Sequence, residues 1–219
     1  CGTPGRVGRL PSGQLVAVMH QVELQQVAYP QTRHAEPVTL FVGGFIGAPS
    51  ITMLEATLEQ TNGTLTAVAG SQRVHLDEET LSLRPALKDY VGKRVILGIR
   101  PEDIEDADLA ADAPADRRLK GQVELREALG SEIMVHFRVD AEPAETEDTK
   151  ELAADVHGEG AAPVHSDKEK GAIIVGRFGA RSHVKEGAPI EAAVDTRALH
   201  FFDPDTGLGI YKAATKGAA

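Results

Sequence analysis

The segment MLEATLEQTNGTLTAV, residues 53–68, carries the clearest structural signal in the chain. Met53 to Glu59 alternates loosely between apolar and polar residues, and Thr64 to Val68 alternates again. Asn62-Gly63 stands between these two runs, and both residues tolerate the positive φ of a tight turn. The segment therefore predicts a β-hairpin.

The pattern of short strands and turns continues along the chain. Arg94 to Arg100 has the composition of a strand, and Pro101 ends it because proline has no N–H for the ladder. The other expected elements are strands at 73–76, 121–127, 133–139, 172–177, 190–194 and 199–202, a turn at 129–131, a short helix at 85–91, a loop at 102–118 and a turn at 203–207. Many short strands and few helices predict a mainly β chain built as small barrels or a sandwich. The halves 48–120 and 121–212 are interpreted as two related barrels.

Two stretches interrupt this β pattern. Residues 41–49, FVGGFIGAP, are apolar, rich in glycine and closed by proline, so they are interpreted as a crossing between two domains rather than a long helix. Residues 140–170 have almost no large apolar side chains, which predicts a mobile insertion because such a segment cannot offset its ordering entropy. Elsewhere we expect a strand at 15–19, a helical turn at 30–36 and a frayed tail after Lys212.

Composition argues against some classes of function. The 219 residues carry a formal net charge of −10 and include no Trp, three Tyr and six Phe. Such a chain repels phosphate backbones and anionic lipid and offers few rings for base stacking, which disfavours a nucleic-acid or membrane-surface binder. The single cysteine, Cys1, cannot form an intramolecular disulfide. With no long apolar run and no signal peptide, a soluble cytoplasmic chain is expected, and the start at Cys1 is interpreted as that of a fragment.

A search for catalytic residues finds no convincing set. The sequence has no Gly-x-x-x-x-Gly-Lys-Ser/Thr, whose lysine and hydroxyl would hold the phosphates of ATP and Mg²⁺. The eight histidines include no pair at the i, i+4 spacing of zinc enzymes, and no Gly-x-Ser-x-Gly elbow occurs. Acidic pairs such as Glu102-Asp103 are interpreted as solvated surface. These observations predict a binding or regulatory module that is not an enzyme and has no cofactor or metal site of its own.

Four segments, in this order, resemble one protein family. They are Gln26, Pro30 and Pro37 followed by residues 41–49; then Gly98-Ile99-Arg100-Pro101-Glu102; then Glu127-Ala128-Leu129-Gly130-Ser131-Glu132; and finally Phe202-Asp203-Pro204-Asp205-Thr206-Gly207. Each motif is weak alone. Together they are similar to the C-terminal half of the ATP-binding subunits of bacterial ABC-type carbohydrate importers, of the maltose, trehalose, multiple-sugar and glycerol-phosphate type. The resemblance covers residues 16–212, with departures at Ala28, Arg33 and His34.

The resemblance implies two small OB-like barrels that follow an ATPase domain. It assigns residues 1–47 to a short α/β remnant of that domain with its linker, and residues 48–219 to a regulatory domain that pairs two subunits and receives regulatory signals. It also implies a parent ATPase that uses ATP and Mg²⁺, located in the cytoplasm at the inner membrane. The implied partners are a second copy, the rest of the subunit, the permease subunits indirectly, and a regulatory protein or small molecule.

The residues that the resemblance marks as scaffold or dimer contacts come from these motifs. They are Phe45, Gly47, Pro49, Gly98, Arg100, Pro101, Glu102, Glu127, Leu129, Gly130, Glu132, Phe202, Asp203, Thr206 and Gly207. Gly98 and Pro101 are expected to bracket a sharp strand end. Arg100 and Glu102 could tie that end to a neighbouring segment by charge-assisted bonds, and Asp203 is expected to cap the turn that follows it.

Two other functions stay open at this point. Related β modules bind oxyanions, so the alternative is a free-standing small-ligand binder with Arg100, Arg177 and Arg181 as candidate contacts. An OB-type nucleic-acid binder is disfavoured by the acidic charge and the scarcity of aromatic residues.

Overall fold

The computed structural model describes residues 7–9, 16–20, 23–28, 37–45, 50–145 and 171–211. Near the N-terminus, three strands form an antiparallel sheet, followed by a six-residue helix; these elements are β1 (Val7–Arg9), β2 (Val16–His20), β3 (Glu23–Ala28) and α2 (Leu40–Phe45). β2 confirms the strand expected at 15–19, and the shortness of α2 agrees with the interpretation of residues 41–49. The helical turn expected at 30–36 and the tail after Lys212 lie outside the described residues.

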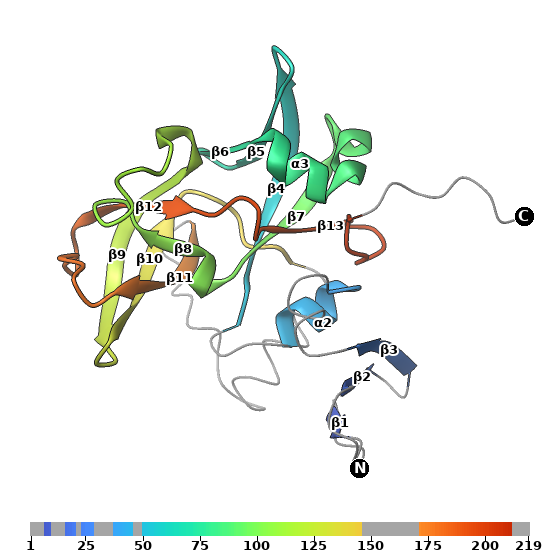
Figure 1. The fold of residues 1–219 in the computed structure, drawn as a ribbon, viewed down its shortest axis with the longest axis horizontal. Coiled ribbons are helices and arrows are strands. Elements are labelled where there is room, and N and C mark those ends of the chain that lie inside the picture. Colours follow the sequence, from blue (N-terminus) through green and yellow to red (C-terminus); the bar gives the residue numbers. More distant parts are fainter. Residues whose placement is uncertain are drawn as a thin grey trace, which may run out of the picture.

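The predicted hairpin lies at the centre of a five-stranded antiparallel sheet. Its strands, in spatial order, are β13 (His200–Phe202), β7 (Arg94–Ile99), β4 (Thr52–Thr61), β5 (Thr64–Ala69) and β6 (Gln72–Leu76). Asn62 and Gly63 have φ of 52° and 82°, so the turn adopts the positive-φ conformation that these two residues favour. The hairpin projects from the rest of the sheet (Figure 1).

A second five-stranded antiparallel sheet curls into a nearly closed barrel. Its strands, in spatial order, are β11 (Ala172–Gly179), β10 (Glu132–Val139), β9 (Arg118–Ala128), β12 (Pro189–Val194) and β8 (Ile104–Asp106). The edge strands β8 and β11 lie side by side. The Gly179 amide donates to both oxygens of the Glu105 side chain, at 3.0 and 3.2 Å, so a carboxylate bridges the place where the ladder does not close.

Each sheet takes one strand from the other half of the chain. β8 leaves the first half to join the second sheet, and β13 returns from the second half to join the first. The expected division into halves 48–120 and 121–212 is therefore wrong for these two strands. Each has three residues, too few for an alternating pattern to assign it to a sheet.

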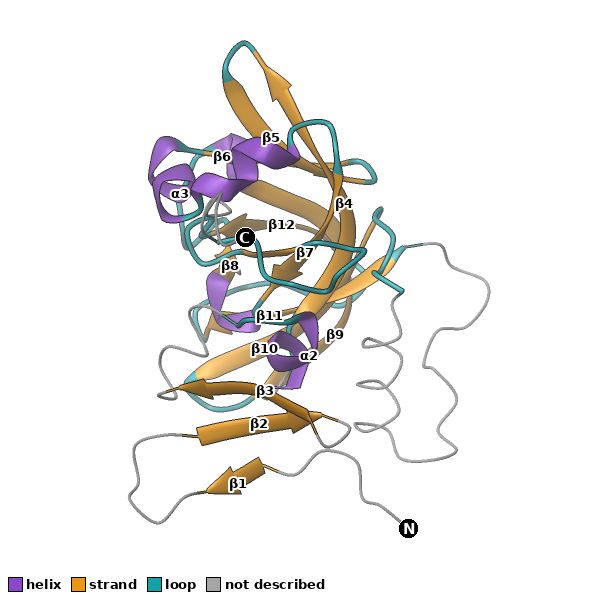
Figure 2. Ribbon diagram, turned by 90° about the vertical axis from the view of Figure 1, so that its right-hand side faces the viewer, coloured by secondary structure: helices purple, strands orange, loops and turns teal. Residues whose placement is uncertain are grey.

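Short helices cover one end of the first sheet, and the sequence anticipated only part of them. The helix expected at 85–91 is the 3-10 helix η1 (Pro85–Tyr90), preceded by an unexpected α3 (Glu78–Leu83) that Asp77 caps by accepting from the Thr80 amide at 2.8 Å. Figure 2 shows α3 close to β6, the strand that precedes it in the chain. The expected loop at 102–118 contains β8 and two 3-10 turns, η2 (Pro101–Asp103) and η3 (Ala115–Arg117).

One hydrophobic core spans both five-stranded sheets. It includes Leu58 and Leu97 from the first sheet and Phe137 and Phe178 from the second, all at most 1% exposed. A smaller buried cluster joins α2 to the first sheet through Leu40, Ile51, Met53, Ile96, Ala144 and Phe202. The two sheets are thus packed as one body, with α2 seated on the side of the first.

The start of the expected insertion is held against the first sheet. The Ala144 amide donates to the Met53 carbonyl at 2.9 Å, and the Glu55 amide donates to the Glu142 carbonyl at 2.9 Å. The prediction of a mobile segment beyond residue 145 falls outside the described residues. Within the described part of the chain, no helix is long and apolar enough to cross a membrane.

Candidate functional site

The Gly98–Glu102 motif forms the crossover from the first sheet to the second. Gly98 pairs with His200 across β7 and β13, and a side chain at Gly98 would place its Cβ 2.6 Å from Ile51 Cδ1. β7 ends at Ile99, and Pro101 begins η2. The expected sharp strand end is confirmed, and the close approach of Ile51 explains why this position suits glycine.

Arg100 is buried in this crossover, with 3% of the residue exposed. Its Nε donates to His200 Nε2 at 3.1 Å, so that ring nitrogen must be an acceptor and the proton of the neutral imidazole lies on Nδ1, which faces Tyr211 Oη at 3.3 Å. Burial lowers the pKa of Arg100, while the charges of Glu102 and Asp103 oppose that shift. Arg100 therefore makes the expected charge-assisted bond, and its partner is a histidine. Glu102, the other residue expected to make such a bond, is exposed.

A second crossover, residues 195–199 between β12 and β13, lies against the first. The Asp195 amide donates to the Asp103 carbonyl at 2.9 Å and so joins the two. Burial, with the negative charges of Glu102 and Asp195, raises the pKa of Asp103 to about 7, although Arg100 pulls it down. One of its oxygens, Oδ2, is buried and has no hydrogen-bond partner among the described residues. The crossing point therefore holds a carboxyl group that titrates near neutral pH.

The Phe202–Gly207 motif covers the end of β13 and most of the turn that follows it. We call residues 203–209 the C-terminal turn. Asp203 Oδ1 accepts from the Asp205 amide, the Thr206 amide and the Thr206 hydroxyl, at 2.9 to 3.0 Å. Gly207 has a φ of 68°, which glycine adopts without strain. The expectation that Asp203 caps this turn is confirmed.

Tyr90, from the end of η1, supports the C-terminal turn from outside. Its hydroxyl donates to Asp203 Oδ2 at 2.7 Å. Burial and the bond to Asp203 raise the pKa of Tyr90 to about 12. Burial alone would raise the pKa of Asp203, but the bonds from Tyr90, Thr206 and Asp205 hold it below its usual value.

The C-terminal turn also binds the segment that leads into α2. The Leu40 amide donates to the Gly207 carbonyl at 2.8 Å, and the Gly209 amide donates to the Val38 carbonyl at 2.9 Å. These two bonds flank an antiparallel bridge between Thr39 and Leu208. Two parts of the chain that are far apart in sequence are thereby held as a short ladder.

The Glu127–Glu132 motif is the end of the β9–β10 hairpin, in the second sheet. Gly130 has a φ of 88°, and the acids at either side contact basic partners: Glu127 Oε2 lies 3.2 Å from His136 Nε2, and Glu132 Oε2 lies 3.3 Å from Arg177 Nε. Leu129 at the tip is 61% exposed and Leu125 is 43% exposed. We call residues 125–132 the hairpin end; it is an apolar tip with charges of both signs beside it.

The structure brings some of the motif residues together and leaves others apart. Gly98 and Phe202 share the β7–β13 ladder, whereas the hairpin end belongs to the other sheet. Gly47 and Pro49 lie outside the described residues, and Phe45 ends α2. The interpretation of Asp103 as solvated surface is wrong, because its Oδ2 is buried at the crossover. Sequence reasoning also missed the roles of Tyr90 and His200, because their partners lie 100 to 113 residues away and no local pattern marks them.

The three arginines of the oxyanion hypothesis do not form one site among the described residues. Arg100 is buried beside His200. Arg177, on β11, pairs with Glu132 of β10, and Arg181 is exposed in the turn that follows β11. None of them lines the cavities described below. The structure thus gives this alternative no binding site built from its candidate residues.

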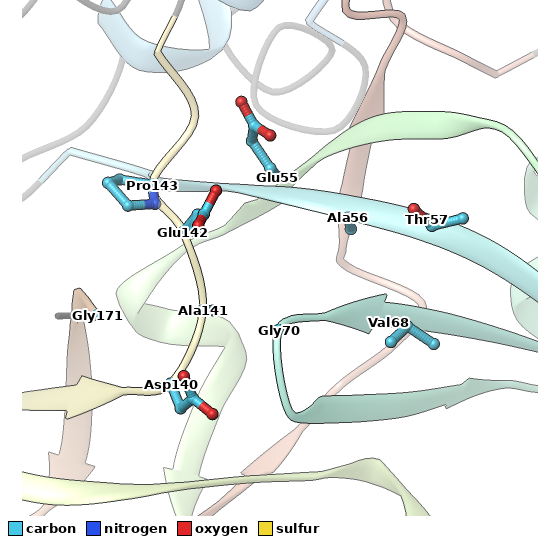
Figure 3. Close-up of a pocket in the computed structure, with 10 residues that line it drawn as sticks. All are labelled: Glu55, Ala56, Thr57, Val68, Gly70, Asp140, Ala141, Glu142, Pro143 and Gly171. Atoms are coloured by element: carbon cyan, nitrogen blue, oxygen red, sulfur yellow. The ribbon is translucent and has the colours of Figure 1, made fainter.

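Described residues line two surface cavities of several hundred cubic ångströms each. One, of about 460 Å³, lies between β4, the β5–β6 turn and residues 140–143, and Figure 3 shows its acids Glu55, Glu142 and Asp140 spread along it rather than converging. The other, of about 550 Å³, contains Arg118 and Lys120, both of which pair with Glu191. Among the described residues, no group of three or more acidic, histidine or cysteine side chains could hold a metal ion.

Comparison with known proteins identifies the family. The model of the MalK OB fold domain matches residues 47–104, and that of the TOBE domain matches residues 97–157. The trehalose/maltose import ATP-binding protein MalK of Thermococcus litoralis is 32% identical over 95% of this chain and 47% of its own length. The trehalose import ATP-binding protein SugC of Mycobacterium tuberculosis is 32% identical over 90% and 47%, and the oligosaccharides import ATP-binding protein MsmX of Bacillus subtilis is 28% identical over 87% and 43%.

This chain belongs to the C-terminal region of the ABC sugar-importer ATP-binding subunits. It spans about half the length of the curated relatives of that family that it matches. An OB fold domain and a TOBE domain in a mainly β chain confirm the predicted fold class. The two matched ranges overlap at residues 97–104, which is the crossover that contains the Gly98–Glu102 motif.

A solved structure of the cytoplasmic molybdate-binding protein ModG with molybdate bound covers 68% of this chain and 93% of its own. The identity is 13% and the TM-score is 0.40, a likeness too low to indicate a shared function.

Proposed function

We propose that this chain is the part of an ABC importer ATPase subunit that pairs two copies of the subunit and relays control to ATP-driven carbohydrate uptake. The parent subunit binds and hydrolyses ATP with Mg²⁺ in its preceding part and works at the cytoplasmic face of the membrane with permease subunits. A regulatory protein or a small molecule provides the control. Membership in the family supports the general role, and the hairpin end carries the proposal that two copies pair.

The hairpin end has the composition of a contact between identical copies. Leu129 and Leu125 are both substantially exposed although they are large and apolar. Glu127, Glu132, His136 and Arg177 surround them with both signs of charge. A two-fold axis placed at the tip would bury the leucines against their own copies and would bring acids of one copy near bases of the other, as an isologous contact requires.

The test is the self-association of the full-length subunit, measured by sedimentation velocity. Leu125→Ser together with Leu129→Ser is expected to raise the dimer dissociation constant at least about tenfold, because contact residues near the centre of an interface carry most of its binding energy. Leu83→Ser is the matched control, since Leu83 is 55% exposed but lies on α3. Unchanged association in the double variant, or an equal loss in the control, would rule out the hairpin end as the pairing surface.

A further inference from the structure

The segment 37–45 is held to the first sheet by the small buried cluster around Leu40 and, along its backbone, by hydrogen bonds to the C-terminal turn. Its backbone pairs with the C-terminal turn through the Leu40–Gly207 and Gly209–Val38 hydrogen bonds. Leu40, fully buried, packs in the same small cluster as Phe202. The backbone bonds depend on the shape of the C-terminal turn, whereas the packing contact comes from β13, which leads directly into that turn.

The fit between these two segments is tight. A side chain at Gly43 would place its Cβ 3.0 Å from the Phe202 ring, and one at Gly209 would place its Cβ 2.7 Å from the Pro37 carbonyl oxygen. A methyl group at Gly43 would require the Phe202 ring to shift by a few tenths of an ångström, whereas one at Gly209 would meet the Tyr211 ring and the backbone of Pro37. The segment 37–45 is therefore seated at a defined place and not loosely apposed.

The C-terminal turn keeps its shape through Asp203. One carboxylate oxygen accepts hydrogen bonds from the amides of Asp205 and Thr206. In addition, the Gly207 amide donates to the Asp203 backbone carbonyl at 2.8 Å. The other oxygen accepts from the Tyr90 hydroxyl. Tyr90 is the last residue of η1, which is far in sequence from both β13 and α2. Its hydrogen bond therefore anchors the C-terminal turn to a third part of the chain.

We infer that the C-terminal turn is a latch that seats residues 37–45 on the first sheet, and that Tyr90 is the residue that holds the latch closed. Opening the latch breaks the two cross-bonds while the ladders of both five-stranded sheets stay intact, so it is a local event. Val38 and Leu208, which flank the bridge between the two segments, are 44% and 49% exposed.

The latch determines how the region before residue 37 is positioned on the barrels. For the transporter this consequence rests on the proposed function, in which that region leads from the ATPase part. A change at the C-terminal turn or at Tyr90 would then loosen the connection through which the barrels act on the ATPase, without touching the hairpin end.

Hydrogen exchange of the 219-residue chain tests whether the latch is a local unit. Asp203→Ala is expected to speed exchange at the Leu40 and Gly209 amides at least about tenfold, and Tyr90→Phe about threefold, because each removes hydrogen bonds that hold the turn. The Val135 amide in β10 should keep its rate. Asp205→Ala is the matched control: this acid is in the same turn, but only its backbone amide bonds to Asp203.

The outcomes separate a latch from a general loss of stability. If Leu40 and Gly209 exchange at parent rates in Asp203→Ala, the inference is overturned. If all amides speed up together in Asp203→Ala, Tyr90→Phe decides, because the latch requires its effect to stay at Leu40 and Gly209. Sedimentation measures the pairing of subunits, and hydrogen exchange does not depend on it. A negative result for the latch would therefore leave the proposed function intact, and a negative result for pairing would leave the latch intact.

A distance measurement tests the positional consequence. Spin labels at Gln25→Cys in β3 and Gln60→Cys, an exposed position on β4, with Cys1→Ser as background, report the placement of the preceding region on the first sheet. We expect a single narrow distance distribution that broadens in Asp203→Ala and stays narrow in Asp205→Ala. A parent distribution as broad as that of Asp203→Ala would overturn the claim that the latch sets this position.

Discussion

The C-terminal turn and the hairpin end both begin as turn motifs in the sequence, yet they have opposite surroundings. The C-terminal turn is bonded on two sides, by Asp203 to Tyr90 and by Gly207 to Leu40, and it follows the fully buried Phe202. The hairpin end reaches outward, with Leu129 61% exposed at its tip.

The difference shows that a family motif can preserve either an internal junction or an outward surface. A residue of the first kind acts on stability and on the relative position of two segments. A residue of the second kind acts on association and should hardly change stability. The predictions below separate the two kinds, in order of decreasing expected effect.

Phe202→Ala should be the most damaging of these changes. It removes a fully buried ring from the small cluster that joins α2 to the first sheet, which typically lowers the free energy of unfolding by about 3–5 kcal/mol. Urea unfolding monitored by circular dichroism measures the loss. Leu129→Ala, at the hairpin end, is the control and should change stability by less than about 0.5 kcal/mol. Equal losses in the two variants would contradict the distinction between junction and surface.

Gly98→Ala should destabilise the crossover by about 1–2 kcal/mol, because the new methyl group would displace Ile51 Cδ1 and crowd His200 Cβ at 3.2 Å. The test is a double-mutant cycle with Ile51→Val, which removes that Cδ1 atom. The valine variant should recover part of the loss caused by Gly98→Ala, so the two changes should not be additive. Additive losses would show that crowding by Ile51 is not the reason for glycine at this position.

Asp103→Asn should stabilise the protein above neutral pH. The native pKa of about 7 lies above the ordinary value of 3.8, so the native state holds a proton that the unfolded chain has lost, and stability falls as pH rises from about 4 to about 7. Asparagine removes this dependence. At pH 8 the variant should be more stable by roughly 1–2 kcal/mol, a figure reduced for the partial solvent screening of this half-buried group.

Thermal unfolding of Asp103→Asn between pH 4 and pH 8 measures this prediction. The difference in stability between variant and parent should grow across that window and then level off. A difference that stays constant with pH would mean that Asp103 does not titrate there.

Glu127→Gln should have the smallest effect, less than about 0.5 kcal/mol, because its partner His136 and the carboxylate are both in contact with solvent. Thermal unfolding at pH 7 in low salt measures it, with Glu132→Gln as a parallel variant at the other side of the tip. A loss above about 1 kcal/mol in either would indicate that the hairpin end is part of the stabilising core and not a surface.

The sequence predicted the local structure well where a short-range cause is sufficient. Asn62-Gly63 specifies its hairpin because both residues accept positive φ, Pro101 ends its strand because it lacks an N–H, and Asp203 caps its turn because its side chain reaches amides two and three residues ahead. α3 was missed although Asp77 and two following acids are an N-terminal helix signal, since six residues give little periodicity.

What the sequence by itself determined is the set of turns, most strands, the mainly β class and, through its four motifs, the family. Only the tertiary structure decided which sheet β8 and β13 join, that Arg100 bonds to His200, and that Tyr90 holds the C-terminal turn. The physical reason is the range of the interactions. Turn and strand preferences act over a few neighbouring residues, whereas these pairings bring together groups that are about 100 residues apart in the chain and become favourable only when both sheets have formed their common core.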